Sequence, residues 1–169
     1  MYYQTTCESP IGILTMVSDG TSLVGLWTQG QQHFMNSVKE EMVEKADVPV
    51  FNQTKNWLKM YFHGEKPSIL NLKLAPQGSK FRQQVWRILC EIPYGKVTTY
   101  GDIAKEIARK QGKEKMSAQA VGGAVGHNPI SIIIPCHRVI GRDGSMTGYA
   151  GGIDKKKWLL KFEGYECLE

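Results

Sequence analysis

The sequence has few cysteines, and the four it has are scattered: Cys7, Cys90, Cys136 and Cys167. No two of them form a C-x-x-C pair, and no histidine stands at the spacing of a zinc ligand. The pattern therefore indicates neither a disulfide-stapled fold nor a cysteine and histidine metal site. We expect a protein that holds no metal and no cofactor.

Long apolar runs are also absent, and the first residues lack the pattern of a signal peptide. A membrane-spanning helix needs about 20 consecutive apolar residues. We therefore expect a protein of the reducing cytoplasm that does not bind a membrane. Its 169 residues are 41% hydrophobic and 22% charged, a composition that can bury a core without staples.

The net charge of +5 is unevenly distributed. Residues 1–76 hold six Lys and Arg against seven Asp and Glu, a net charge of −1, whereas residues 77–169 hold 15 against nine, a net charge of +6. A basic part joined to a neutral part indicates that the second part meets a polyanion, with nucleic acid the first candidate. The alternative is a solvated basic face without a ligand.

The first part predicts a small antiparallel sheet with helices. Alternating residues between turn signals predict strands over 2–7, 12–18 and 22–29. Apolar residues at helical spacing predict helices over 36–45 and 51–63, and a last strand could follow over 68–74. The chain then breaks at 76–78, where the charge also changes. We therefore expect two domains, residues 1–76 and residues 77–169.

The second part predicts mostly helices. We expect a helix over 81–91 capped by Ser79, a short strand over 97–99, and helices from 100 or 101 to about 110 and over 117–126. The last two, joined by a short polar loop, form a helix-turn-helix pattern in which the second helix approaches DNA.

That second helix carries almost no side-chain bulk, since its small residues are Ala118, Ala120, Gly122, Gly123, Ala124 and Gly126. A helix that reads the major groove would instead display Arg, Asn or Gln. A slim helix lets the backbone come close to a partner, which could be a neighbouring helix or the minor groove. The sequence pattern leaves both readings open.

Residues 132–140 combine an apolar run with a reactive pair. The three isoleucines at 132–134 predict a buried strand that ends at Pro135, which places Cys136 at a strand terminus. An adjacent His137 that accepts the thiol proton would make Cys136 a nucleophile. The alternative is that Cys136 is only a small buried hydrophobic residue.

Four segments resemble the 6-O-alkylguanine-DNA alkyltransferases, also called methylated-DNA-protein-cysteine methyltransferases, of the bacterial type. They are Pro-Cys-His-Arg-Val at 135–139, Gly-Tyr-Ala-Gly-Gly at 148–152, Trp-Leu-Leu at 158–160 and Glu-Gly at 163–164. The resemblance covers residues 80–164. It implies a small N-terminal α/β domain of the ribonuclease-H-like type with an antiparallel sheet, and a mostly helical, winged-helix-like C-terminal domain.

The resemblance also implies direct reversal of DNA alkylation. After the nucleotide is flipped, Cys136 takes the alkyl group from 6-O-alkylguanine, or 4-O-alkylthymine, and the stable thioether ends the protein's activity. His137 would be the general base, acting through a water, and Glu163 would orient it. Asn128 would be a hinge. Tyr100 would crowd the DNA phosphate, help to rotate the nucleotide out and donate a proton to the leaving guanine.

Further residues follow from the same resemblance. The substrate pocket would be lined by Tyr149, Ala150, Gly151, Val139, Ile134 and Trp86. The surface that binds DNA in the minor groove would comprise Tyr100, Ser117, Ala118, Gln119, Ala120, Gly122 and Arg138. The implied partner is double-stranded DNA carrying alkylated guanine, bound by a monomer that associates with the nucleoid.

Two positions depart from the family pattern. Gln119 stands where most relatives have an arginine that fills the gap left by the flipped nucleotide, and Ala150 replaces a serine that some relatives use. Cys7 does not fit the structural zinc site of some members.

Three other functions stay open. A lesion sensor would lack Cys136, a winged-helix regulator would show a reading helix with polar side chains, and a cysteine hydrolase would turn over repeatedly.

Overall fold

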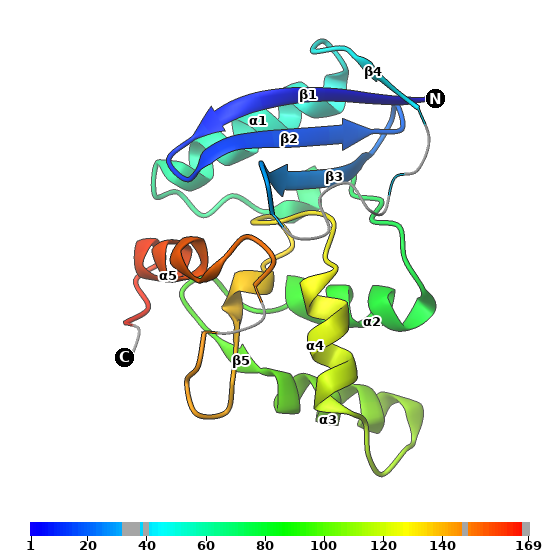
Figure 1. Cartoon of the computed structure of the whole chain (residues 1–169), viewed down its shortest axis with the longest axis vertical. Coiled ribbons are helices and arrows are strands. Elements are labelled where there is room, and N and C mark those ends of the chain that lie inside the picture. Colours follow the sequence, from blue (N-terminus) through cyan, green and yellow to red (C-terminus); the bar gives the residue numbers. More distant parts are fainter. Residues whose placement is uncertain (32–37, 39–40, 147–148, 167–169) are drawn as a thin grey trace. The chain divides into compact units, whose positions relative to one another are not determined.

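The structure, a computed structural model, describes residues 1–31, 38, 41–146 and 149–166 (Figure 1). These residues form two compact units. Unit 1 comprises Met1–Gln77 with the short return Pro129–Ser131, and unit 2 comprises Gly78–Asn128 and the chain from Ile132 onward. Among the described residues, no helix is long and apolar enough to span a membrane.

Unit 1 is built on a four-stranded sheet with the strand order β3-β2-β1-β4. The strands β1 (Tyr2–Ser9), β2 (Gly12–Ser18) and β3 (Leu23–Thr28) pair antiparallel, as the sequence predicts. The tight turn between β1 and β2 is closed by the Ser9 hydroxyl, which donates to the Gly12 carbonyl at 2.7 Å. The short return runs beside β3, where the Leu26 amide donates to the Pro129 carbonyl at 2.8 Å.

The helix α1 (Pro49–Phe62) packs against β1, β2 and β3, and Figure 1 shows it along one face of the sheet. Proline begins this helix without cost because the first helical amide has no partner within the helix. The side chains of Phe51, Trp57 and Tyr61 are buried, as are those of Leu14 and Met16 in β2. The predicted helix over 51–63 is therefore confirmed, and its aromatic residues belong to a core.

Two predictions for unit 1 were wrong. Within the range 36–45, predicted as a helix, Met42–Glu44 forms strand β4, because these residues pair in parallel with the edge of β1; residues 36, 37, 39 and 40 lie outside the described residues. Within 68–74, predicted as a strand, Ile69–Asn71 forms the 3-10 helix η1. The Ser68 hydroxyl accepts the Leu70 amide there, a local bond that competes with strand pairing.

Unit 2 is mostly helical, with α2 (Lys80–Cys90), α3 (Tyr100–Gln111), α4 (Ala118–Gly126) and α5 (Ile153–Phe162). The helices predicted over 81–91, from 100 or 101 to about 110, and over 117–126 are confirmed as α2, α3 and α4, whereas α5 was not predicted. The first three begin at hydroxyl caps provided by Ser79, Thr99 and Ser117. The helix α4 packs on both α2 and α3. Strands β5 (Thr98–Thr99) and β6 (Val139–Ile140) pair in parallel beside them.

The predicted strand over 132–134 was wrong. These isoleucines are buried, but they lie in a turn in which Ile132 has a φ of 72°. Cys136 begins a 3-10 helix of one turn, η2 (Cys136–Arg138), and β6 starts only after it. The Asn128 side chain donates to the Ile134 carbonyl at 2.8 Å, so a side chain takes the place of a neighbouring strand. An apolar run alone does not distinguish a buried turn from a buried strand.

Candidate active site

The thiol of Cys136 is the candidate nucleophile, and it is buried, with 5% of the residue exposed. Burial raises the pKa of this thiol, while the Asn128 side chain and the ammonium of Lys156 act in the opposite direction. Burial has the larger effect, so the pKa of Cys136 lies above its ordinary value and the thiol is protonated at neutral pH. A nearby base is therefore needed to form the thiolate that reacts.

His137 lies beside Cys136 in the turn η2, and its side chain is completely buried. Burial lowers the pKa of the imidazole, and the neighbouring Glu163 opposes this without overcoming it. The ring is therefore neutral near pH 7. Its Nε2 lies 2.7 Å from Oε2 of Glu163, which fixes the ring proton on Nε2 and leaves Nδ1 as an acceptor. Within the described chain, Nδ1 has no hydrogen-bond partner.

Glu163 is the C-cap residue of α5, and four donors surround its carboxylate. Besides His137, the Arg138 guanidinium donates through Nε to Oε1 at 2.8 Å and through Nη2 to Oε2 at 3.1 Å. The Gly95 amide donates to Oε1 at 3.2 Å. Burial by itself would raise the pKa of Glu163, but the hydrogen bonds from His137 and Arg138 outweigh it and lower the pKa. Glu163 is therefore ionised at neutral pH.

The aromatic residues Tyr100 and Tyr149 complete the surroundings of Cys136. Burial and the charge of the Cys136 thiolate raise the pKa of Tyr100, at the start of α3, to about 12. Burial, Cys136 and Glu163 raise the pKa of Tyr149 as well. Both phenols therefore carry their protons at neutral pH. The Tyr149 hydroxyl is buried and has no hydrogen-bond partner among the described residues.

Both parts of the chain match one family. Residues 80–165 match the family described as "6-O-methylguanine DNA methyltransferase, DNA binding domain", and residues 1–76 match its "ribonuclease-like domain". The chain belongs to the 6-O-methylguanine DNA methyltransferase family. The cluster of Cys136, His137 and Glu163 therefore lies within the region that matches the family's DNA-binding domain.

Relatives along the whole chain agree with this membership. The methylated-DNA--protein-cysteine methyltransferase of Methanosarcina acetivorans is 45% identical, with 97% of this chain and 99% of that protein covered, and the one of Haemophilus influenzae is 40% identical, with 95% and 86% covered. Among solved structures, Mycobacterium tuberculosis OGT in complex with DNA is 40% identical, with a TM-score of 0.80 and 96% and 91% coverage.

Lys156 is a buried member of the site that the sequence analysis missed. No part of it is exposed, and its Nζ lies 5.8 Å from the centroid of the Tyr100 ring. Burial lowers the pKa of this amine to about 8, against the effect of Cys136. The sequence offers one signal: Lys156 is three and four residues before Leu159 and Leu160, so a helix places it on their buried face.

The pocket residues occupy different parts of unit 2. Ile134 and Val139 are buried on either side of Cys136 in the sequence, and Ala150 and Gly151 are half-buried beside Tyr149. A Cβ on Gly151 would lie 2.6 Å from the Tyr149 ring, so a larger residue there would force that ring to shift. Trp86 instead packs between α2 and α4, where its indole donates to the Ala124 carbonyl at 2.8 Å.

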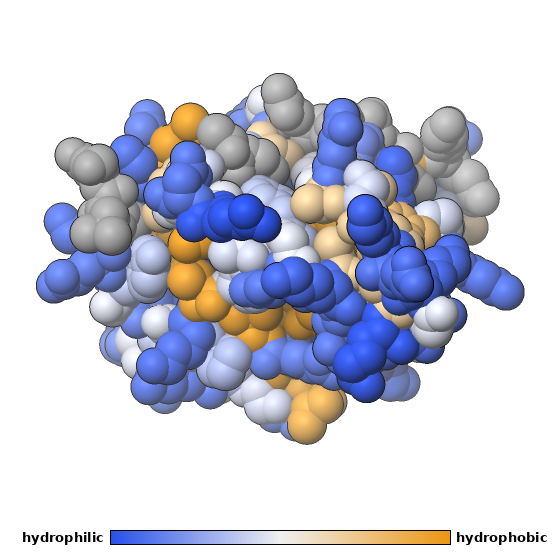
Figure 2. All heavy atoms as spheres, turned by 90° about the horizontal axis from the view of Figure 1, so that it is seen from below, coloured by the Kyte–Doolittle hydropathy of each residue, from blue (hydrophilic) through white to orange (hydrophobic). Residues whose placement is uncertain are grey.

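Most of the residues expected to meet DNA lie at the start of α4. Ser117 caps this helix, and Ser117, Ala118, Gln119, Ala120 and Gly123 are exposed. A Cβ on Gly123 would touch nothing, so packing inside the protein does not explain why that residue is small; one on Gly122 would contact the Tyr100 ring. Figure 2, seen from the α3 end of unit 2 in Figure 1, shows an apolar band with hydrophilic side chains on both sides.

Arg138 is placed differently from the other residues of this predicted surface. The structure groups it with Glu163 and not with α4, and only 11% of its side chain is exposed. Its Nη1 also donates to the Ile92 carbonyl at 2.7 Å, and its guanidinium lies 5.7 Å from the centroid of the Tyr94 ring. The contact between Arg138 and DNA stays a prediction.

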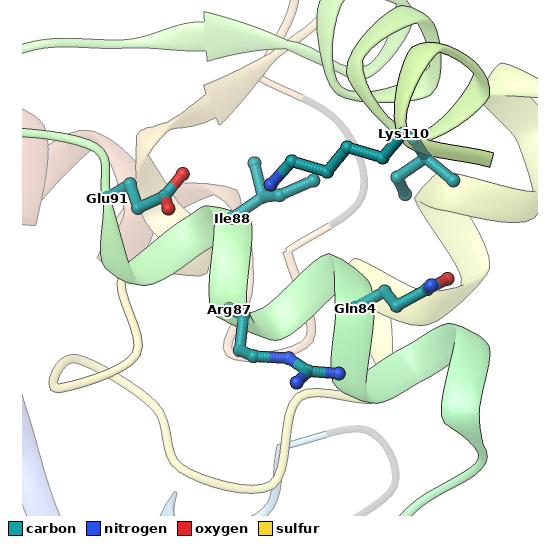
Figure 3. Close-up of a pocket in the computed structure, with 6 residues that line it drawn as sticks. Gln84, Arg87, Ile88, Glu91 and Lys110 are labelled. Carbon is teal, nitrogen blue, oxygen red and sulfur yellow. The ribbon is translucent and has the colours of Figure 1, made fainter. Parts of the chain in front are cut away.

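A hollow lies between α2 and α3, with a volume of about 290 Å³ (Figure 3). Its lining mixes two cations, one carboxylate, an amide and two isoleucines: Gln84, Arg87, Ile88, Glu91, Ile107 and Lys110. None of the predicted site residues lines it, so the chemistry of Cys136 does not extend there. Across the described residues, no group of three His, Cys, Asp or Glu side chains is arranged to hold a metal ion.

Proposed function

We propose that this protein repairs DNA directly, by moving the alkyl group of 6-O-alkylguanine irreversibly to Cys136 in a single turnover. The observation that carries the proposal is the buried cluster of Cys136, His137 and Glu163 in a chain of the 6-O-methylguanine DNA methyltransferase family. Thymine alkylated at its 4-oxygen likewise carries the alkyl carbon on an exocyclic oxygen of the base, so it is a second substrate.

The chemistry begins with the protonated thiol. Nδ1 of His137 takes the thiol proton through a water, since Nε2 is held by Glu163. The buried ammonium of Lys156 favours the thiolate that forms. The sulfur then attacks the alkyl carbon, the new carbon–sulfur bond replaces the carbon–oxygen bond, and the guanine leaves as an anion. The phenol of Tyr100 gives this anion a proton, and the proton that His137 took from the thiol balances the charge left on Tyr100.

DNA binding follows from the surface of α4. An alkyl group on guanine lies inside the duplex, so the nucleotide must rotate out, at a cost of a few kcal/mol. The exposed Ala118 and Ala120 let α4 approach the minor groove without reading bases, and Ser117, Gly122 and Tyr100 lie along the same approach. Gln119 fills the gap in the base stack. The net charge of +6 on residues 77–169 contributes contacts to phosphates.

The two parts of the chain have different roles in this function. Residues 77–169 hold both the acceptor cysteine and the DNA surface, and residues 1–76 form the ribonuclease-like domain. The protein acts as a monomer in the cytoplasm, at the nucleoid when bound to DNA. A lesion sensor would lack the acceptor cysteine, and a regulator that reads the major groove would present polar side chains where α4 presents alanines.

The test is to incubate the protein with duplex DNA carrying 6-O-methylguanine and to measure the intact mass. We expect the protein to gain one methyl group, mapped to Cys136, and at most one equivalent of guanine to be repaired. Cys136→Ala should gain no methyl group, whereas the exchange of another free thiol, Cys90→Ala, should leave the gain intact. An unmodified protein, or several repaired guanines for each protein, would refute the proposal.

A further inference from the structure

The contacts of Arg138 form a rigid support behind the site. Both ends of its guanidinium fork bind the two oxygens of Glu163, at 2.8 and 3.1 Å, and its remaining amino group binds the Ile92 carbonyl at 2.7 Å. A bidentate pair of this kind fixes the plane of the carboxylate as well as its position. The Tyr94 ring lies near the guanidinium and helps to hold it.

The geometry also determines how charge is distributed around His137. Glu163 is a buried anion that would favour a protonated imidazole at 2.7 Å if it stood alone. Arg138 is a permanent cation on the same carboxylate, so the anion and this cation largely cancel at the position of the ring. The imidazole therefore donates to a carboxylate of fixed position, and the combined charge of Glu163 and Arg138 near the ring is small.

We propose that Arg138 is a positioning residue, which holds Glu163 in place and balances its charge so that His137 remains a neutral base with Nδ1 available to the Cys136 thiol. This role differs from the DNA contact expected from the sequence, because the groups of Arg138 that would meet a phosphate are bound to Glu163 and Ile92. The charge balance concerns the protein itself, and only its effect on rate depends on the proposed alkyl transfer.

The pKa of His137 depends on burial and on three charged neighbours, Glu163, Arg138 and Lys156. Burial lowers its pKa most, Glu163 raises it, and Arg138 and Lys156 lower it. In Arg138→Met one lowering cation is lost while Glu163 keeps its charge. The His137 pKa should therefore rise by about one unit or more. Arg138→Lys keeps the charge but loses the fork, and should give a smaller rise.

The experiment has two readouts on the same variants. The first is the pKa of His137, followed by NMR titration of the ring in the protein free of DNA. The second is the pH profile of the rate of methyl transfer from 6-O-methylguanine DNA. In Arg138→Met both the titration and the acid limb of the profile should move to higher pH. The control Arg142→Met, an exposed arginine of unit 2, should move neither.

The role proposed for Arg138 and the proposed alkyl transfer are refuted by different results. An unchanged His137 pKa in a folded Arg138→Met protein would overturn the inference, and Arg138→Lys decides the matter by the same criterion if Arg138→Met does not fold. DNA affinity that loses about one charge from its salt dependence, with an unmoved pH profile, would make Arg138 a DNA contact. Absence of methyl transfer in the unmodified protein would refute the proposed function, while the titration would still test Arg138.

Discussion

Nε2 of His137 lies 2.7 Å from Oε2 of Glu163, and both side chains are completely buried although 26 residues separate them in the chain. Two features of the backbone bring them together: the turn η2 presents His137, and Glu163 ends α5. The pair gives the site a base with a fixed orientation.

Removing the charge of Glu163 should damage both activity and stability. In Glu163→Gln the Arg138 guanidinium becomes a mostly buried cation without its carboxylate, which should lower the free energy of unfolding by about 3 kcal/mol. His137 also loses its anionic acceptor, and the rate of methyl transfer should fall about a hundredfold. Urea denaturation and single-turnover kinetics measure the two effects. Glu166→Gln, on an exposed residue, should change neither; a fully active Glu163→Gln would remove Glu163 from the mechanism.

The buried ammonium of Lys156 should lower the stability of the folded protein and raise the reactivity of the Cys136 thiol. Its pKa is about 8 in the folded protein and 10.5 ordinarily, so the unfolded chain binds more protons between these pH values, and stability rises as pH rises through them. The cost below pH 8 is up to about 3 kcal/mol. Lys156→Met should therefore be more stable than the unmodified protein at pH 7, with the advantage lost above about pH 10.5.

The same variant should react about tenfold more slowly at pH 7, because the thiolate of Cys136 loses a nearby cation. Urea denaturation at several pH values and single-turnover kinetics provide the measurements. Lys155→Met, on a half-buried neighbour in α5, serves as the matched control. A stability difference that does not depend on pH would contradict the charge argument.

Gly95 should be needed for the position of Glu163. It has a φ of +78°, and a Cβ there would lie 2.9 Å from the Glu163 backbone oxygen. Gly95→Ala should cost about 2 kcal/mol of stability and slow methyl transfer, because Glu163 must move. Gly112→Ala is the matched control, since its φ is +65° but its Cβ would touch nothing. That variant should cost about 1 kcal/mol and leave the rate unchanged; equal rates in the two variants would refute the role of Gly95.

Gln119 is exposed near the start of α4, where an arginine would add charge and a flat stacking surface. Gln119→Arg should tighten binding to duplex DNA or speed its repair about fivefold, roughly the effect of one cation stacked on a base. Gln119→Ala should act in the opposite direction. Repair of a free methylated guanine base should be the same in all three proteins. Unchanged rates on duplex DNA would mean that glutamine fills the stack as well as arginine.

The elements that depend on neighbours in sequence could be predicted from the sequence. The hydroxyl of Ser117 and the small residues after it define α4, and the apolar spacing in 81–91 defines α2. Residues 42–44 and 68–74 were assigned wrongly, because a partner strand and a local hydroxyl decided their conformation. For the site, the sequence indicated Cys136 and His137 as a pair by adjacency, and a family motif brought in Glu163.

Patterns between neighbouring residues were therefore enough to predict α2, α3 and α4, the adjacency of a thiol and an imidazole, and the concentration of positive charge after residue 76, whereas α5 was not predicted. Only the tertiary structure decided that Cys136 lies on a buried turn, that Arg138 binds Glu163, and that Lys156 lies inside the protein. The physical reason is that capping and amphipathic spacing act over a few residues. Burial and ion pairing depend on groups that only folding brings together.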